Sequence, residues 1–272
     1  MPELPEVETT LRGIAPHLNG RMVVEVRIRE HRLRWHVPRH LPTTLHGQTI
    51  IGLARRAKYL LLRVPTGTVI IHMGMSGSMR IVNRAAPPAA HDHVDFELAG
   101  GAVLRFRDPR RFGCILWHRG SDPSGHRLLR HLGPEPLASE FDGDYLYKRS
   151  RRRSLAVKSF IMDSKVVVGV GNIYASEALH RSGIHPLRGA GRISCERYRR
   201  LARSIRSTLN EAILAGGTTL RDFTNGEGNP GYFEQSLQVY GRAGKPCGRC
   251  GNTIRQRVIN QRASYFCLRC QR

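Results

Sequence analysis

The chain has 272 residues, of which 44 are lysine or arginine and 21 are aspartate or glutamate, for a formal net charge of +23. This excess of positive charge indicates a polyanionic partner, with nucleic acid ahead of an anionic membrane surface because no basic amphipathic helix is evident. The apolar runs are far shorter than the roughly 20 residues of a membrane span, and the first residues lack a signal-peptide pattern. We therefore expect no membrane partner and a cytoplasmic, nucleoid-associated location.

The first eighteen residues carry apolar side chains at helical spacing, namely Val7, Leu11, Ile14 and Leu18. This period predicts a helix over residues 1–18, and Gly20 is a suitable place for the helix to stop.

The second and third residues combine a proline with a glutamate. If Met1 is removed, Pro2 offers a secondary amine that can attack an electrophilic carbon and form a Schiff base, and the carboxyl of Glu3 can shuttle protons. The same residues are also ordinary helix starters, because proline fits the first turn and a carboxylate complements the helix dipole. Taken alone, the opening octapeptide favours the helix start.

From about residue 22 to residue 118 the pattern changes to short β-rich runs separated by turn residues. Thr66-Gly67 and Gly100-Gly101 favour hairpin turns. Short strands at regular spacing predict a β-sandwich or barrel. The expected strands are Met22–Ile28, Tyr59–Val64, Thr68–His72, Val94–Leu98, Val103–Arg107 and Cys114–Trp117.

Helical periodicity returns after a Gly-, Ser- and Pro-rich connection at 120–136 and a basic segment at 147–153. One helix is predicted from Ile173 to Leu179 with Gly183 as its stop, and a longer one after the N-cap residue Ser194. The longer helix closes at Gly216-Gly217, and residues 224–232, with three glycines and a proline, predict a loop. Its apolar face consists of Tyr198, Leu201, Ile205, Leu209 and Ala212.

Two Cys-x2-Cys pairs, separated by sixteen residues, stand near the end of the chain: Cys247, Cys250, Cys267 and Cys270. This spacing is typical of a tetrahedral zinc site and favours zinc over free thiols, while a reducing cytoplasm disfavours the other alternative, two disulfides. Four sulfur ligands close the coordination shell, so we expect one structural Zn2+. Cys114 and Cys195 are left as core or surface residues.

The segment between the cysteine pairs can form a hairpin from residues 253–258 and 264–267, with Asn260-Gln261-Arg262 at its tip. After Glu234 the chain contains eight lysines or arginines and no acid. A zinc-held hairpin with one sign of charge indicates contact with phosphates, and Arg262 is the candidate residue. The alternative is that Arg262 is a solvated turn residue.

Seven segments along the chain together resemble one family. They are Pro2-Glu-Leu-Pro-Glu-Val-Glu, Arg56-Ala-Lys58-Tyr-Leu-Leu, His72-Met-Gly-Met75-Ser-Gly, His91-Asp-His93, Asp108-Pro-Arg110-Arg-Phe112-Gly, Val168-Gly-Val-Gly-Asn172-Ile-Tyr-Ala-Ser-Glu, and the cysteine pairs. The set runs from residue 2 to residue 270 and resembles the bacterial formamidopyrimidine-DNA glycosylases, also called 8-oxoguanine DNA glycosylases.

The resemblance implies an α+β multidomain fold. Residues 1–130 would form an N-terminal helix with a β-sandwich, residues 131–237 a helix-two-turn-helix domain, and residues 238–272 the zinc-finger hairpin. A loop at 218–231 would close over an extruded base. The implied partner is double-stranded DNA containing oxidised bases, bound by a monomer.

The resemblance also implies a bifunctional glycosylase and abasic-site lyase that removes oxidised purines, 8-oxoguanine and formamidopyrimidines. Pro2 would attack the anomeric carbon and expel the base, while Glu3 would donate and accept protons at the sugar. The Schiff base would then open by β- and δ-elimination, to which Lys58 and Arg262 respectively are matched. From the sequence alone, the preferred interpretation of Lys58 is a strand lysine whose stem covers apolar surface.

Contacts with DNA are implied for six residues. A base flipped out of the duplex leaves a gap, and Met75, Arg110 and Phe112 match the residues that fill it. Core packing is the alternative for Met75 and Phe112, although the Gly-Met-Ser-Gly setting and the adjacent arginines indicate a surface.

The other contacts implied by resemblance involve His91, Arg153 and Asn172, together with Arg110. Asn172 follows Gly-x-Gly and opens a helix, where backbone amides bind phosphate well, although a tight structural turn has the same composition. His91 and His93 are alternatively a metal pair, for which no third ligand is evident.

Two other functions stay open: an endonuclease VIII-like glycosylase for oxidised pyrimidines, and a non-catalytic zinc-finger DNA-binding protein. The complete set of Met75, Arg110 and Phe112, with Leu4 after Glu3, resembles the purine branch more closely. The presence of Pro2, Glu3 and Lys58 favours an enzyme.

Overall fold

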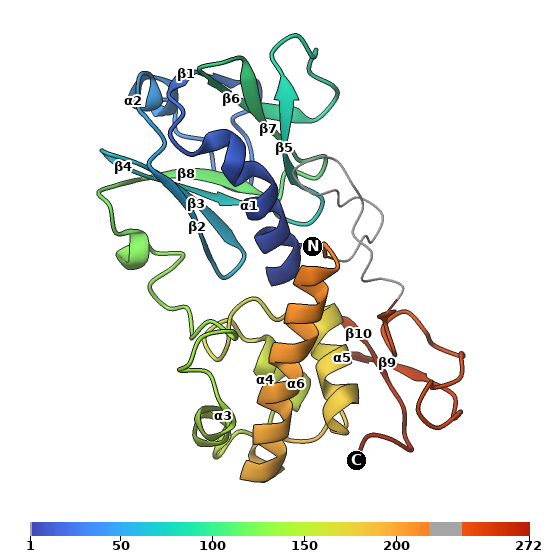
Figure 1. Cartoon of the computed structure of the whole chain (residues 1–272). Coiled ribbons are helices and arrows are strands. Elements are labelled where there is room, and N and C mark those ends of the chain that lie inside the picture. The colour runs from blue at the N-terminus through green and yellow to red at the C-terminus, as the bar shows by residue number, and fades with distance from the viewer. Residues whose placement is uncertain (1, 218–235) are drawn as a thin grey trace. The chain divides into compact units, whose positions relative to one another are not determined.

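A computed structural model describes residues 2–217 and 236–272. The expected loop at 218–231 lies outside these residues. None of the described helices is long and apolar enough to cross a membrane. The described residues form two compact units, residues 2–130 with 215–217 and residues 131–214 with 236–272 (Figure 1).

The first unit is a β-sandwich of two antiparallel sheets, each with four strands among the described residues (Figure 1). Apolar side chains of both sheets, such as Phe96 and Leu104 from one and Leu62 and Val69 from the other, meet in one buried cluster. The predicted sandwich is therefore confirmed. In spatial order the sheets contain β1 (Val23–Ile28), β6 (Asp92–Leu98), β7 (Ala102–Arg107) and β5 (Ser78–Asn83), and β2 (Gly52–Arg56), β3 (Tyr59–Val64), β4 (Gly67–His72) and β8 (Cys114–Arg119).

Helix α1 (Leu4–Leu18) contacts β2 and β5, the edge strands of the two sheets, and covers one side of the sandwich. Its periodic residues Val7, Ile14 and Leu18 are buried, as predicted. The helix begins at Leu4 and not at residue 1, because Glu3 occupies the N-cap position. Pro2 therefore precedes the helix and is not part of its first turn.

Strand β6 is buried along its whole length although three of its seven residues are acidic. Asp95 accepts two hydrogen bonds of 2.9 Å from Arg105 and one of 2.6 Å from Arg29. Burial disfavours the charged carboxylate, but these guanidinium groups outweigh burial and lower the pKa of Asp95. Paired charges thus allow a strand with an acidic outer face to occupy the middle of a sheet.

In the first unit the strands β2 and β5 and the short helix α2 (Leu41–Leu45) were not predicted, and in the second unit the helices α3 (Gly143–Ser150) and α4 (Val157–Met162) were not predicted. β2 ends in two arginines and is half-buried at every position, since it is an edge strand, so its sequence shows no clear alternation. The hairpin between β3 and β4 turns at Pro65-Thr66 and not at Thr66-Gly67, because Gly67 pairs with Val64. Gly100 and Gly101 do lie between β6 and β7, both with positive φ.

The second unit packs α5 against α4 and α6, and α3 against α6. Gly183 ends α5 in the left-handed conformation, with φ 71° and ψ 26°, as predicted. Ser194 accepts a hydrogen bond of 3.4 Å from the N–H of Arg197 at the start of α6, and the predicted apolar face of α6 is buried. The helices are α3 (Gly143–Ser150), α4 (Val157–Met162), α5 (Asn172–Ser182) and α6 (Cys195–Leu214), with short 3-10 turns η1 (Pro123–Gly125) in the first unit and η2 (Ala190–Arg192) here.

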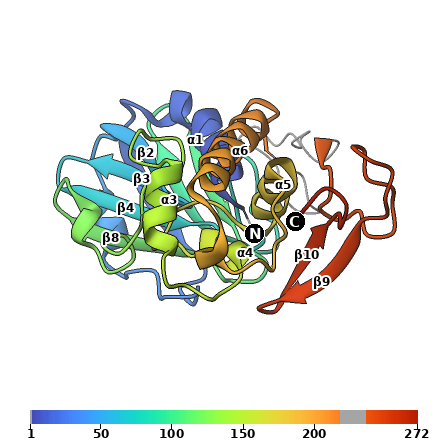
Figure 2. The same cartoon turned by 90° about the horizontal axis from the view of Figure 1, so that it is seen from below.

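The hairpin of β9 (Arg255–Ile259) and β10 (Arg262–Phe266) belongs to the second unit and lies beside α5 (Figure 2). Asn260 and Gln261 both have positive φ and form a two-residue turn, which suits the twist of a hairpin. Arg262 pairs with Ile259, so it is the first residue of β10. The predicted three-residue turn was therefore wrong by one residue, because Arg262 belongs to the strand and not to the turn.

We predict that Phe96→Ala destabilises the first unit by about 3–5 kcal/mol, because Phe96 is fully buried between the sheets. Both tryptophans, Trp35 and Trp117, lie in this unit, so the urea midpoint measured by tryptophan fluorescence reports on it. Ile51→Ala is the control, because Ile51 is 62% exposed, and its midpoint should stay close to that of the unsubstituted protein. Equal midpoints for the two variants would contradict the packing described above.

Candidate functional site

Pro2 and Glu3 are both buried at the start of α1. The carboxyl of Glu3 is part of a reciprocal capping box: it accepts the N–H of Glu6, and Glu6 Oε2 accepts the N–H of Glu3 at 2.7 Å. These bonds fix the backbone on the carboxyl side of Pro2. A buried carboxyl therefore stands directly beside the residue whose nitrogen is the candidate nucleophile.

Lys58 lies in the turn between β2 and β3, after Ala57, whose φ of 56° is left-handed. Arg55 connects this turn with α1, since it donates to Glu8 Oε2 and to the carbonyl of Ala57, each at 2.9 Å. Burial raises the pKa of Glu8, but the hydrogen bonds and positive charges of Arg55 and Arg12 together outweigh that effect and lower the pKa. The helix that begins after Glu3 is thus bonded to the turn that carries Lys58.

His72, the last residue of β4, accepts a hydrogen bond of 2.9 Å at Nδ1 from the N–H of Gly74. The neutral ring therefore carries its proton on Nε2. Burial, followed by the positive charges of Lys58 and Arg34, lowers the pKa of His72 to about 4. Neutral His72 thus holds the start of the turn in which Met75 lies.

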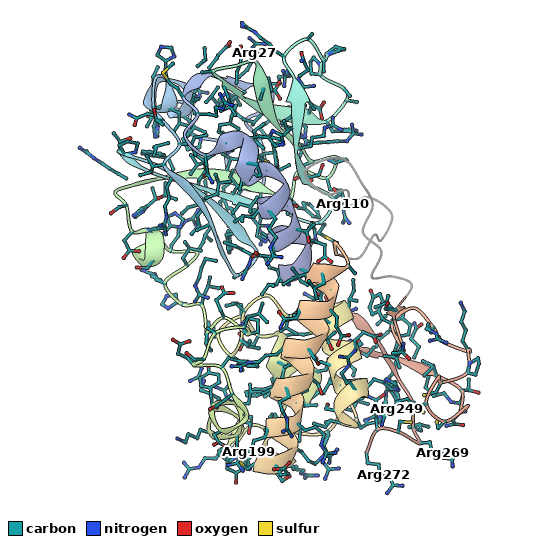
Figure 3. The ribbon with its side chains drawn as sticks, viewed as in Figure 1. Arg27, Arg110, Arg199, Arg249, Arg269 and Arg272 are labelled. Atoms are coloured by element: carbon teal, nitrogen blue, oxygen red, sulfur yellow. The ribbon has the colours of Figure 1, made fainter. Side chains whose placement is uncertain are left out.

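Met75 and Phe112 are 42% and 44% exposed, which excludes core packing for either side chain. The guanidinium of Arg110 lies 4.8 Å from the centroid of the Phe112 ring, a cation–π contact. Figure 3 shows Arg110 projecting from the first unit. Exposed apolar side chains on turns, with an arginine beside them, are suited to insertion between unstacked bases.

Asp108 has no exposed surface and connects the loops that carry these side chains. Its Oδ2 accepts the N–H of Gly113 at 2.7 Å, and its Oδ1 accepts the hydroxyl of Ser76 at 3.2 Å. Its own N–H donates to the carbonyl of His91 at 3.1 Å. One buried carboxylate and its backbone therefore orient the Met75 turn, the Phe112 loop and the corner at His91.

His91 is exposed and has a left-handed backbone with φ 73°. His93 is buried, and its Nε2 lies 2.8 Å from the carbonyl of Asp108. Among the described residues, only the four clustered cysteines form a group of three or more potential metal ligands. A metal pair of His91 and His93 therefore has no support, and His93 has a structural role.

Arg262 is exposed, and the residue after it is held by two side chains of the same unit. The carbonyl of Ala263 accepts hydrogen bonds from Asn172 Nδ2 at 3.0 Å and from Lys158 Nζ at 3.1 Å. Lys158, only 1% exposed, also donates to Ser264 Oγ at 2.7 Å. Asn172 therefore orients the strand that carries Arg262 in this structure, while its Oδ1 is buried without a partner among the described residues.

Arg153 is exposed on a loop whose backbone is fixed by Gly191, which donates to the Arg153 carbonyl at 2.7 Å. Arg153 lines a pocket of the second unit together with Arg152 and Arg192. A pocket bordered by three guanidinium groups suits a phosphate oxygen.

The four cysteine sulfurs at the base of the β9–β10 hairpin lie within 4.8 Å of one another. The separation is 4.0 Å between Cys247 and Cys270 and 3.5 Å between Cys250 and Cys267. A tetrahedral Zn2+ with bonds of about 2.3 Å places its sulfurs about 3.8 Å apart, so the cluster fits one structural zinc ion. Cys114 is buried in β8, where burial raises the pKa of its thiol to about 12, and Cys195 is half-buried.

Several residues that organise the site were not singled out from the sequence. Asp108 and His72 stand inside motifs of the resemblance, but nothing in the sequence shows what their side chains contact. The sequence carries a weak indication that Lys158 has a specific partner, because it is the one charged residue in the apolar helix α4. The candidate residues divide between the units: the first contains Pro2, Glu3, Lys58, Met75, His91, Arg110 and Phe112, and the second contains Arg153, Asn172, Arg262 and the four cysteines.

Three family profiles match successive parts of the chain. They are described as the formamidopyrimidine-DNA glycosylase N-terminal domain over residues 1–115, the formamidopyrimidine-DNA glycosylase H2TH domain over residues 132–224, and a zinc finger found in FPG and IleRS over residues 244–272.

Relatives in other bacteria are similar over the full length. The chain is 61% identical to the formamidopyrimidine-DNA glycosylase of Syntrophotalea carbinolica and 60% identical to that of Alkalilimnicola ehrlichii, covering 100% of each protein and of this chain. Among solved structures, a Lactococcus lactis FPG variant with DNA containing Fapy-dG matches with a TM-score of 0.93 and 31% identity, covering 100% of both chains. MutM (FPG) from Thermus thermophilus matches with a TM-score of 0.88 and 36% identity, covering 99% of this chain and 98% of that one.

We predict that Asp108→Asn destabilises the first unit by about 1–3 kcal/mol, because the amide removes the negative charge that strengthens both hydrogen bonds and replaces one of the two oxygens that accept from Gly113 and Ser76 with a donor. Amide hydrogen exchange should speed up in residues 74–77 and 110–113. The matched control is Asp122→Asn, because exposed Asp122 also accepts a backbone N–H and a hydroxyl, both from Ser124. Equal exchange in these loops for both variants would contradict the role of Asp108.

We predict that His72 makes the first unit less stable as the pH falls from 6.5 to 4. Its pKa is lower in the folded state, so the unfolded chain binds more protons in this window, at about 1.4 kcal/mol per pKa unit of difference. His72→Gln, which keeps an acceptor for the Gly74 N–H, should lose less stability over the same range. The measurement is the urea midpoint by tryptophan fluorescence at several pH values, and identical slopes for the two proteins would rule the effect out.

Proposed function

The chain belongs to the formamidopyrimidine-DNA glycosylase family and is a base-excision-repair DNA glycosylase, and on that basis we propose that Pro2 is its nucleophile. Once Met1 is removed, the Pro2 nitrogen attacks the anomeric carbon of the damaged nucleotide, the bond to the base breaks, and the base leaves with a proton. The nitrogen loses its hydrogen, the bond between the anomeric carbon and the ring oxygen then breaks as that oxygen takes a proton from Glu3, and the opened sugar is held to Pro2 as an iminium ion. The substrates are 8-oxoguanine and formamidopyrimidines in double-stranded DNA.

The observation that carries this proposal is the placement of Glu3. Glu3 is 3% exposed and follows Pro2 directly, and its carboxyl is oriented by the capping box with Glu6. A carboxyl shielded from water next to the reacting nitrogen is suited to donate a proton to the sugar oxygen and to take one back. The helix thus positions acid and amine together.

Strand cleavage follows from the iminium ion. This cation acidifies the neighbouring sugar carbon, so loss of that proton expels the phosphate on one side (β-elimination), and a second proton loss expels the phosphate on the other side (δ-elimination). We assign Lys58 to the first elimination and Arg262 to the second. A one-nucleotide gap with phosphates at both ends remains.

The remaining candidate residues bind the DNA. Met75, Arg110 and Phe112 fill the gap left by the flipped nucleotide, which offsets part of its unstacking cost. His91 and Arg153 contact the backbone, and Asn172 joins Arg262 at the phosphates. The exposure of Met75 and Phe112, and the positive charge of the hairpin, support these roles.

We further propose three functional domains, residues 1–130, 131–237 and 238–272, with the loop at 218–231 closing over the extruded base. The family profiles, which start anew near residues 132 and 244, support this division. A DNA substrate and a charge of +23 support a location with the nucleoid in the cytoplasm.

We predict that borohydride traps a covalent adduct between the protein and a duplex with 8-oxoguanine opposite cytosine, because hydride reduces the iminium ion to a stable amine. The adduct, measured as a shifted band on a denaturing gel, should disappear when one extra residue precedes Pro2, since the nitrogen is then an amide. Pro5→Ala is the matched control: Pro5 is also buried, but the substitution leaves the terminal amine intact, so trapping should persist.

The extended protein and three duplexes distinguish between the possible nucleophiles, activities and substrates. An adduct that survives the amino-terminal extension would assign the nucleophile to another residue. No adduct with either 8-oxoguanine or abasic DNA would remove the lyase activity from this chain. Faster trapping with thymine glycol than with 8-oxoguanine would place the chain with the enzymes for oxidised pyrimidines.

A further inference from the structure

His180 lies on α5 with its ring against the zinc site, and no role in the reaction has been given to it. We propose that His180 Nε2–H donates a hydrogen bond to the Cys247 thiolate from outside the coordination shell, and that it thereby positions Cys247 and lowers the reactivity of its sulfur. His180 is a positioning residue for the metal centre, and this role does not depend on the glycosylase reaction.

The geometry fits a donor and not a ligand. His180 Nε2 lies 3.5 Å from Cys247 Sγ, and the His180 side chain is only 1% exposed. Cys247 already belongs to the group of four sulfurs within 4.8 Å of one another, which fill the tetrahedral shell of a zinc ion. A metal-bound thiolate has no proton to give, so the ring nitrogen that faces it must carry the hydrogen.

The backbone of His180 contacts the same cysteine pair. Arg249, which stands between Cys247 and Cys250, donates from Nη1 to the His180 carbonyl at 3.2 Å. Figure 3 shows Arg249 and Arg269 in this part of the second unit. The first cysteine pair is thus bound to one residue of α5 twice, through the ring and through the carbonyl.

The preceding turn of α5 also binds the segment of the chain that leads into the zinc site. Glu177, 5% exposed, accepts three backbone N–H groups from Gln238, Val239 and Tyr240 at 2.8–3.0 Å. Glu177 and His180 are three residues apart, so they lie on the same side of the helix. One carboxylate orients the chain that leads into the zinc site, and one imidazole orients its first sulfur.

The chemical effect follows from the charge on the metal centre. Four thiolates around Zn2+ give a net charge of −2 in a partly buried setting, and an N–H directed at one sulfur withdraws electron density from it. Cys247 is itself 2% exposed. A sulfur that shares its lone pair with a hydrogen-bond donor is a weaker nucleophile toward alkylating and oxidising reagents.

The test uses the full-length zinc-loaded protein and three variants. His180→Phe keeps an aromatic ring and removes the donor, and His180→Gln returns an N–H donor. His185→Phe is the matched control, because the His185 ring also packs on the hairpin, 4.5 Å from the Phe266 ring, without being bonded to a sulfur. Circular dichroism melting establishes that each variant is folded before it is compared.

The first measurement is the rate of iodoacetamide alkylation at each cysteine, located by mass spectrometry. We expect His180→Phe to accelerate alkylation at Cys247 selectively and to weaken zinc retention against a chelator about 10–100-fold, the usual effect of losing such a partner. His180→Gln should recover most of the loss, and His185→Phe should match the unsubstituted protein.

The second measurement uses cobalt in place of zinc. Removal of the hydrogen bond raises the energy of the sulfur lone pair, so the thiolate-to-cobalt charge-transfer band should move to longer wavelength in His180→Phe and return in His180→Gln. An unchanged band together with unchanged alkylation at Cys247 would overturn the proposal. A spectrum of three sulfurs and one nitrogen in the unsubstituted protein would also overturn it, because His180 would then be a ligand.

Discussion

The second unit depends on one constraint: a two-stranded hairpin cannot hold itself together in water. The β9–β10 hairpin is therefore supported along its length by groups from the helices. Lys158 and Asn172 bind the carbonyl of Ala263 near its turn, and the metal centre closes its base. The chain's last residues return to the end of α5, where Gln271 donates to the carbonyl of Ile184 at 2.9 Å. An exposed arginine such as Arg262 can have a defined position only because its backbone is held in this way.

In the first unit, the segments that carry exposed side chains are also held in a defined position, here by buried charged groups. Asp95 and Asp108 are both buried carboxylates: Asp95 is paired with Arg105 and Arg29, and both oxygens of Asp108 accept hydrogen bonds, from Gly113 and Ser76. Asp95 stabilises the pairing of strands within the sheet, whereas Asp108 orients the loops that carry Met75 and Phe112. The exposed Met75 and Phe112 are the reverse case, apolar groups kept in water, and their loops need a rigid base to present them.

The sequence predicted what is local or periodic. The cysteine spacing located the metal centre, the helical period located α1 and α6, and Gly183 marked the end of α5. Contacts between distant residues could not be predicted. His180 is 67 residues from Cys247, and Asp108 is 32 residues from Ser76. No spacing rule connects such pairs, because the fold alone brings them together. Arg262 was placed in the turn because the register of the hairpin depends on which two residues adopt positive φ.

The double position of Glu3, as helix cap and as proposed proton carrier, has a consequence for protein engineering. Serine, threonine, aspartate and asparagine are the preferred N-cap residues, and glutamate is not among them. Selection for thermal stability alone would therefore accept shorter side chains at position 3, and some would strengthen α1. Under the proposed mechanism those same changes withdraw the carboxyl from the sugar. Heat resistance and turnover are in this way opposed at a single residue, and a library screened only for survival on heating would drift toward stable proteins that no longer repair DNA.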